Sequence, residues 1–175
     1  MPFTPYHFGP ALLIGMILVP FIDISAILIA SVILDLEPLA VLLFHLSYPL
    51  HGIFHTYLVA SFVAVLLSIV LWPLRSFLNT IVSIFGINQE STFQSLLLAS
   101  FIGTYSHVFL DSFLYAEMNP FYPLLGNPFF GLIQSQVIYS LCVLSGFLGL
   151  IAYGGHLLYR YYKSKNLKQS QSSLS

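Results

Sequence analysis

Charged residues are scarce in this chain of 175 residues: Asp, Glu, Lys and Arg make up 6% of it, whereas 58% is hydrophobic. An average soluble domain carries roughly 25% charged residues, so this composition excludes an ordinary soluble protein. Apolar runs in a membrane satisfy their backbone polar groups internally as helices. We therefore expect an all-α, polytopic membrane protein whose partner is the lipid bilayer. The net charge of -1 gives no indication of a nucleic-acid partner.

Cysteine is almost absent too. Cys142 is the single cysteine, so the chain forms no intramolecular disulfide and reports nothing about a redox compartment. Basic residues are missing from the start: no Lys or Arg precedes the first apolar run, and no clear small-residue cleavage site follows it. A removable signal peptide has both features. We therefore expect His7 to remain in the mature protein.

Five apolar runs are predicted as helices, and a helix that crosses a bilayer needs about 20 apolar residues. The last three runs are long enough, whereas the first is short and the second is interrupted by Asp35, Glu37 and Pro38. The runs cover residues 9–21, 24–45, 56–74, 92–115 and 131–158. We expect one transmembrane helical domain over residues 1–160. A cytoplasmic tail over residues 161–175, basic and then rich in Ser and Gln, is expected to be disordered.

The few basic residues predict the orientation in the membrane. Arg75 follows the third run, and the other Lys and Arg residues follow the fifth; with five crossings these two places lie on one side. The opposite side contains no Lys or Arg. The positive-inside rule therefore predicts a multi-pass protein of the cell membrane, with its N-terminus outside and its C-terminus in the cytoplasm.

An ionisable pair stands out within the fourth run. His107 and Asp111 are four residues apart, so they share one face of a helix. Ser100, Gly103 and Thr104 continue that face with the small residues that allow membrane helices to approach closely. Because an ionisable side chain inside an apolar helix is costly, the pair is a functional-site hypothesis.

The predicted order of membrane crossings also places further histidines and carboxylates on the outer side of the membrane. Imidazole and carboxylate groups, without a second cysteine, are ligands for zinc or another first-row divalent metal. We expect zinc, with manganese as the alternative, and one ion or two. The expected ligands are Asp35, His55, His107 and Asp111, with His7 either joining them or holding a second ion that shares Asp111.

Glu37 and His51 lie near the expected ligands, and the sequence leaves their roles open. Asp35 and Glu37 would point about 200° apart on one helix, so we expect only Asp35 to be a ligand unless the helix breaks at Pro38. Glu37 is then either a helix-end group that reaches water or a general base beside a metal-bound water. His51 precedes His55 by four residues and is a further, weaker ligand candidate.

Taken together, these segments resemble the YdjM-like family of membrane-bound metal-dependent hydrolases. The resemblance rests on Thr4-Pro5-Tyr6-His7-Phe8-Gly9, Asp35-Leu36-Glu37-Pro38, the 51–56 segment, and the His107-x-x-x-Asp111 helix before a Pro-rich loop. A remoter likeness is to the ligand order of zinc-dependent phospholipases C and related nucleases. The family pattern has a His-Arg-Gly that is absent here, since His51 is followed directly by Gly52. The resemblance therefore fits His55 better than His51.

The resemblance implies a hydrolase in which a metal-activated water attacks an ester or phosphoester. The aromatic loop over residues 121–130 would suit a lipid-like substrate. Membrane carboxylates and histidines also mark transporters and proton or ion relays, which is the alternative function. A relay needs titratable groups through the whole membrane depth, whereas these lie almost entirely in the outer half. A haem-binding bundle would leave the carboxylates unexplained, and a non-catalytic membrane protein would leave their sorting to one side unexplained.

Overall fold

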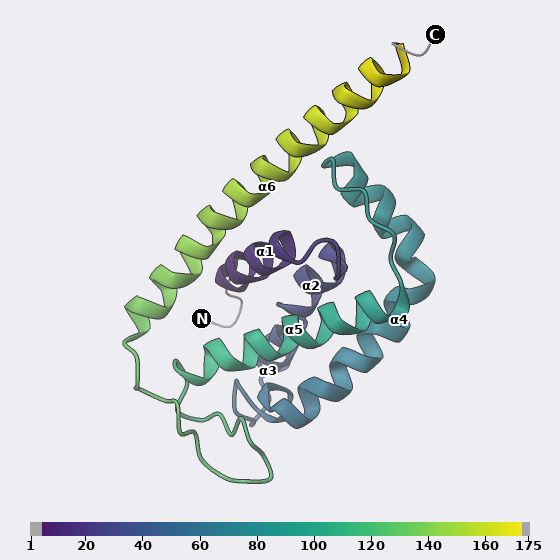
Figure 1. Cartoon of the computed structure of the whole chain (residues 1–175). Helices are drawn as coiled ribbons and strands as arrows, with labels where there is room; N and C mark the ends of the chain where they lie inside the picture. Colours follow the sequence, from purple (N-terminus) through teal and green to yellow (C-terminus); the bar gives the residue numbers. More distant parts are fainter. Residues whose placement is uncertain (1–4, 173–175) are drawn as a thin grey trace.

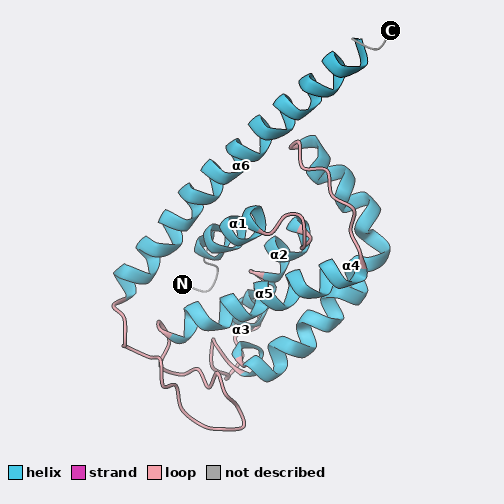
Figure 2. Cartoon of the chain, viewed as in Figure 1, coloured by secondary structure: helices cyan, strands magenta, loops and turns pink. Residues whose placement is uncertain are grey.

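The computed structural model describes residues 5–172, which form helices joined by loops, with no strand in that range (Figure 2). The start of the Thr4 motif and residues 173–175 of the tail lie outside the described residues. The elements are η1 Pro5–His7, α1 Phe8–Ile17, α2 Ile24–Ala30, η2 Ile33–Asp35, α3 Leu36–Leu43, η3 Ile53–His55, α4 Tyr57–Ile84, α5 Phe93–Ser112 and α6 Ser135–Ser172.

Four stretches of the described chain are long and apolar enough to cross a membrane: Ile24–Leu43, Tyr57–Ile84, Phe93–Ser112 and Ser135–Asn166. The first of them comprises α2, η2 and α3 in series. The prediction of an all-helical bundle with short or interrupted early helices is confirmed. α1 has only 10 residues, so at about 1.5 Å per residue it is too short to cross a bilayer alone.

The helices pack through small residues. α1 lies along α6, and α2 and α4 both lie against α5 (Figure 1). Gly103 shows why small residues are needed, because a Cβ there would lie 2.9 Å from the carbonyl oxygen of Ile27 in α2. The face of α5 predicted to point inward is buried, whereas Tyr105 and Phe109 on its other face are exposed.

The turn between α1 and α2 is fixed to the connection between α4 and α5. Asp23 caps the N-terminus of α2 by accepting a hydrogen bond from the Ala26 amide, 2.9 Å away. Its other carboxylate oxygen accepts from the Gln89 amide nitrogen at 2.9 Å and from the Ser91 hydroxyl. α1 and α2 therefore form a hairpin that reaches the α4–α5 end of the bundle, and His7 and Asp35 return to the opposite end.

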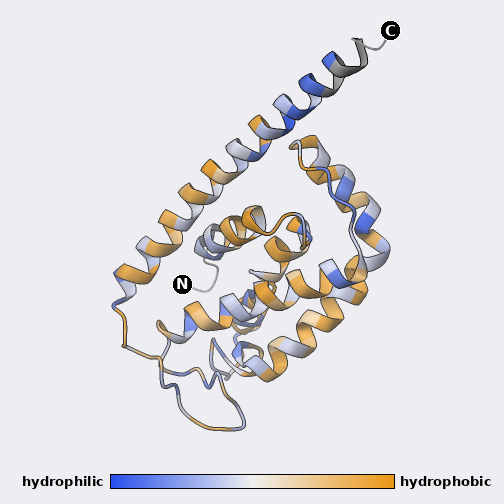
Figure 3. Cartoon of the chain, viewed as in Figure 1, coloured by the Kyte–Doolittle hydropathy of each residue, from blue (hydrophilic) through white to orange (hydrophobic). Residues whose placement is uncertain are grey.

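Two helices extend further than the sequence predicted. α4 continues past Pro73 to Ile84, and Figure 1 shows it bending along its length, as expected for a proline inside a helix. α6 is one helix to Ser172, where we expected a disordered tail from residue 161. The segment after Gly155 contains no Gly or Pro to end the helix, and Lys, Arg, Gln and Leu favour it. Figure 3 shows the hydrophilic colouring of this last part of α6.

Candidate metal centre

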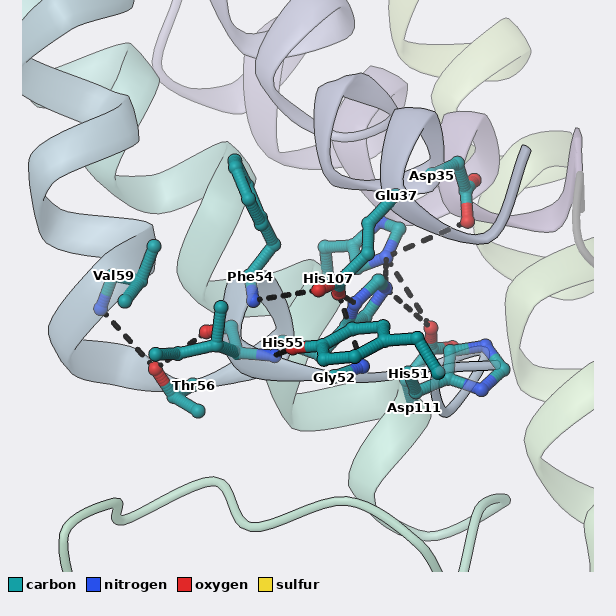
Figure 4. Close-up of polar contacts among 12 residues, drawn as sticks. Asp35, Glu37, His51, Gly52, Phe54, His55, Thr56, Val59, His107 and Asp111 are labelled. Atoms are coloured by element: carbon teal, nitrogen blue, oxygen red, sulfur yellow. Dashed lines mark hydrogen bonds and ion pairs between the residues drawn. The ribbon is translucent and has the colours of Figure 1, made fainter. Parts of the chain in front are cut away.

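Four buried side chains converge from three elements at the end of the bundle near the α5–α6 connection. Asp35 ends η2, His55 ends η3, and His107 and Asp111 lie one turn apart on α5 (Figure 4). One ligand atom from each lies within 4.8 Å of the other three. His107 Nε2 is 3.2 Å from Asp111 Oδ2, 3.2 Å from His55 Nε2 and 3.8 Å from Asp35 Oδ1. Ligand atoms around a tetrahedral zinc ion are about 3.3 to 3.6 Å apart, given bonds of about 2.0 to 2.2 Å.

The interruption after α2 builds this arrangement. Because α2 ends at Ala30, the carbonyl oxygen of Ser31 has no helical partner and accepts a hydrogen bond from His107 Nδ1 at 2.7 Å. The short η2 then carries Asp35 towards α5. The prediction expected a possible break at Pro38, but Pro38 lies within the first turn of α3, and the helical path changes before Glu37.

The hydrogen bonds fix which imidazole nitrogens carry protons. His107 Nδ1 faces a backbone carbonyl, and His55 Nδ1 lies 2.8 Å from Glu37 Oε2; both partners are acceptors, so both Nδ1 atoms donate. In the neutral rings the two Nε2 atoms are then unprotonated, and they face each other at 3.2 Å. Carboxylate oxygens of Asp35 and Asp111 face the same point. This set of electron-pair donors requires a cation, either a metal ion or a proton on one imidazole.

Glu37 lies beside the four-residue group and orients it. Its Oε2 accepts from His55 Nδ1 and from the Gly52 amide at 3.0 Å, and its Oε1 accepts from the Phe54 amide at 3.2 Å. A carboxylate that fixes the ring of a metal-binding histidine is a common partner in metal sites. With both oxygens occupied in this way, Glu37 is better placed to position His55 than to act as the general base that the sequence suggested.

His7 reaches the centre without joining the four-residue group. Its Nε2 lies 3.2 Å from Asp111 Oδ1, and its ring stacks on His107 with centroids 3.9 Å apart. His7 Nδ1 is buried without a hydrogen-bond partner. His7 is thus placed either to orient Asp111 or to hold a second ion that shares this carboxylate; the sequence left open the second of these roles and a place among the ligands.

His51 lies outside the group, in contact with its edge. Its ring meets His55 edge-on at a centroid distance of 4.8 Å and stacks on Tyr115 at 3.6 Å, and its Nδ1 lies 3.0 Å from Glu117 Oε1. The sequence suggested no site role for Glu117 or Tyr115. Their position directly after the His107–Asp111 helix was the signal that could have placed them here.

Burial affects the protonation of His7 and His55, which lie outside the spanning segments. It lowers the pKa of both imidazoles below the ordinary value, although their hydrogen bonds to Asp111 and to Glu37 act in the opposite direction. Neutral imidazole is the form that binds metal. Donor types, spacing, burial and orienting hydrogen bonds therefore fit a divalent ion such as zinc.

Comparison with protein-family models, with curated proteins and with solved structures finds no match for this chain. The centre itself is a buried Asp, His, His, Asp group that could hold a metal ion inside an apolar helical bundle.

Proposed function

We propose that this protein is a membrane-embedded metal-dependent hydrolase of the YdjM-like type. Asp35, His55, His107 and Asp111 hold the ion, and zinc suits this mixed imidazole and carboxylate set. The observation that carries the proposal is the pair of unprotonated Nε2 atoms facing each other at 3.2 Å beside two carboxylates.

When bound, the ion lowers the pKa of a coordinated water to about 7 and polarises an ester or phosphoryl oxygen. The chain's own residues supply the frame for this chemistry. Glu37 and the Ser31 carbonyl hold the two imidazoles in the metal-binding tautomer, and His7 holds Asp111. In the hydrolysis, the water oxygen bonds to the carbonyl carbon or phosphorus, the ester bond breaks, and the water's proton goes to the leaving alcohol.

The orientation follows from charge. Arg160 donates to the carbonyl oxygen of Gly86, so the basic end of α6 and the end of α4 lie at one end of the bundle, opposite the metal centre. The positive-inside rule then directs the centre to the extracytoplasmic face. A reporter fused to the C-terminus tests this: cytoplasmic reporter activity is expected, and an extracytoplasmic signal would overturn the assignment.

A proton or ion relay is less well supported by the structure. From Asp23 to Ser31, α2 is the direct route between the two ends, and its buried residues are Ile24, Ser25, Ala26, Ile27 and Ala30. Ser25 is the only polar member, and its hydroxyl is bonded back to Asp23. This route offers no titratable group between the metal centre and the opposite end.

The test is a hydrolysis assay with the purified protein, supplemented with zinc or manganese. The substrates are phosphodiesters, phosphomonoesters and lipid esters. Activity is expected with one class and is lost in His55→Ala and in Asp111→Ala. His45→Ala is the matched control, since His45 is an exposed histidine outside the centre. Activity that persists in both site variants would remove these residues from the mechanism.

A further inference from the structure

Two apolar cavities lie side by side along the lipid-facing side of α2. The smaller, of about 220 Å³, is lined by Phe8, Leu28, Ile29, Val32, Ile33 and Leu36. The larger, of about 430 Å³, also uses Leu28 and Ile29 and continues towards Val82 and Phe85 at the end of α4. Leu28 and Ile29 line both cavities, so the two cavities adjoin each other. Together we name them the α2 groove.

One end of the α2 groove lies next to the metal centre along the chain. Phe8 directly follows His7, and Leu36 directly follows Asp35, although neither cavity is lined by a residue of the centre itself. The lining runs from Ile24 to Leu36, which is 13 of the 20 residues of the stretch Ile24–Leu43 that is long enough to cross a membrane. One leaflet is half of the roughly 30 Å hydrocarbon core, about 15 Å deep, so the groove extends over the depth that a lipid chain occupies.

The lining excludes a polar occupant. Its polar members are Ser25 and Tyr153, and both hydroxyls are already used: Ser25 donates to Asp23, and Tyr153 donates to the carbonyl oxygen of Phe85 at 2.6 Å.

The groove is continuous with the surface that the spanning segments present to the bilayer, since it lies along Ile24–Leu43. What the bilayer offers at that depth is hydrocarbon chain. We propose that the α2 groove binds one acyl chain of a membrane lipid, with the ester or phosphoester end of that lipid at the metal centre. The acyl site rests on the groove alone, whereas the lipid's role as substrate rests on the proposed function.

Photolabelling tests the acyl site without requiring activity. Full-length protein in detergent micelles is mixed with a two-chain glycerophospholipid that carries a diazirine midway along one chain, irradiated, and the labelled residues are located by mass spectrometry. Labels are expected at Leu28, Ile29 or Ile33. Leu28→Trp and, separately, Ile29→Trp fill the groove and are expected to reduce this labelling at least about fivefold, because bulk at either position occludes the chain.

Leu66→Trp is the matched control, because Leu66 is a lipid-facing leucine on α4, 61% exposed, and lines neither cavity. Its labelling at the groove is expected to equal that of wild type. Metal content of each variant reports separately on the centre. Labels spread evenly over the lipid-facing helices, or unchanged in both groove variants, would overturn the acyl site even if the protein binds metal and hydrolyses esters.

The substrate role has its own readout. If the groove holds the substrate's chain, Leu28→Trp lowers hydrolysis of a long-chain lipid but leaves hydrolysis of a short-chain ester unchanged. Equal loss with both substrates would show that the groove does not select the chain. A metal-free, inactive wild type that is still labelled at Leu28 would refute the hydrolase and leave the acyl site standing.

Discussion

Asp23 and Asp35 are both buried carboxylates, each 2% exposed, at opposite ends of the segment that contains α2. Asp23 accepts hydrogen bonds from two hydroxyls, a backbone amide and the Gln89 side chain. Asp35 faces imidazole nitrogen and lies within 4.8 Å of three other ligand atoms. Burial alone therefore does not mark a site in this bundle. The distinction lies in what surrounds the carboxylate: hydrogen-bond donors surround Asp23, whereas the electron-pair donors of two imidazoles and a second carboxylate converge with Asp35.

The largest contrast between the two ends is expected in metal content. His107→Ala and Asp111→Asn each remove one of four ligands, so both should lower bound metal from about one ion per chain to less than about a tenth. Asp23→Asn should retain the wild-type content. Elemental analysis of protein purified without chelators makes the measurement. Equal metal content in Asp111→Asn and Asp23→Asn would show that the metal centre and the group around Asp23 do not differ in metal binding.

A smaller loss is expected when the orienting carboxylate is changed. Glu37→Gln keeps the shape but removes the charge that fixes His55, and such outer partners typically contribute about 10- to 100-fold to metal affinity. Competition with a chelator of known affinity measures the change. Glu90→Gln, at an exposed carboxylate in the α4–α5 connection, is the control and should bind as wild type does. Unaltered affinity in Glu37→Gln would show that Glu37 does not support the centre.

A change at Asp23, which accepts hydrogen bonds from Ser25, Ala26, Gln89 and Ser91, should lower the stability of the protein rather than its metal content. Asp23→Asn replaces one acceptor oxygen with an NH2 donor, which would face the donors of Gln89 and Ser91, and each buried donor left unpaired costs about 1 to 3 kcal/mol. The free energy of unfolding should fall by about that amount in thermal unfolding of the metal-depleted protein, which removes stabilisation by bound ion. A variant as stable as wild type but with weaker metal binding would reverse the roles given to the two ends.

The smallest effect is expected at the edge of the centre. His51→Ala removes a ring that contacts His55 but has its Nδ1 bonded to Glu117. Metal content should be unchanged, and any loss should appear in stability. Loss of metal comparable to that in His107→Ala would place His51 among the ligands.

Much of the fold was predictable because composition and helical periodicity act locally. The inward face of α5, with its small residues and the His107–Asp111 pair, followed from spacing alone. The helix ends were less predictable: the extension of α4 past Pro73 depends on helix propensity on both sides of the proline, which apolar run length does not report.

The site was predictable as a set, but not the relation between its members. Topology and the positive-inside rule brought Asp35, His55, His107 and Asp111 to one end. The role of Glu37 depends on a bond to His55, 18 residues away, and that of Asp23 on partners 66 and 68 residues away. Pairings over such distances depend on tertiary packing, which the sequence pattern does not encode locally. The burial of Asp23 therefore has no local signal in the sequence.

We infer that two imidazoles and two carboxylates bind one ion, and X-ray absorption at the metal edge of the purified wild-type protein reports on that ligand shell. Nitrogen and oxygen ligands are expected at about 2.0 to 2.2 Å, with the outer-shell scattering of two imidazole rings and no sulfur. A metal-free protein at neutral pH, or a shell without imidazole, would contradict it and leave a proton between His55 and His107.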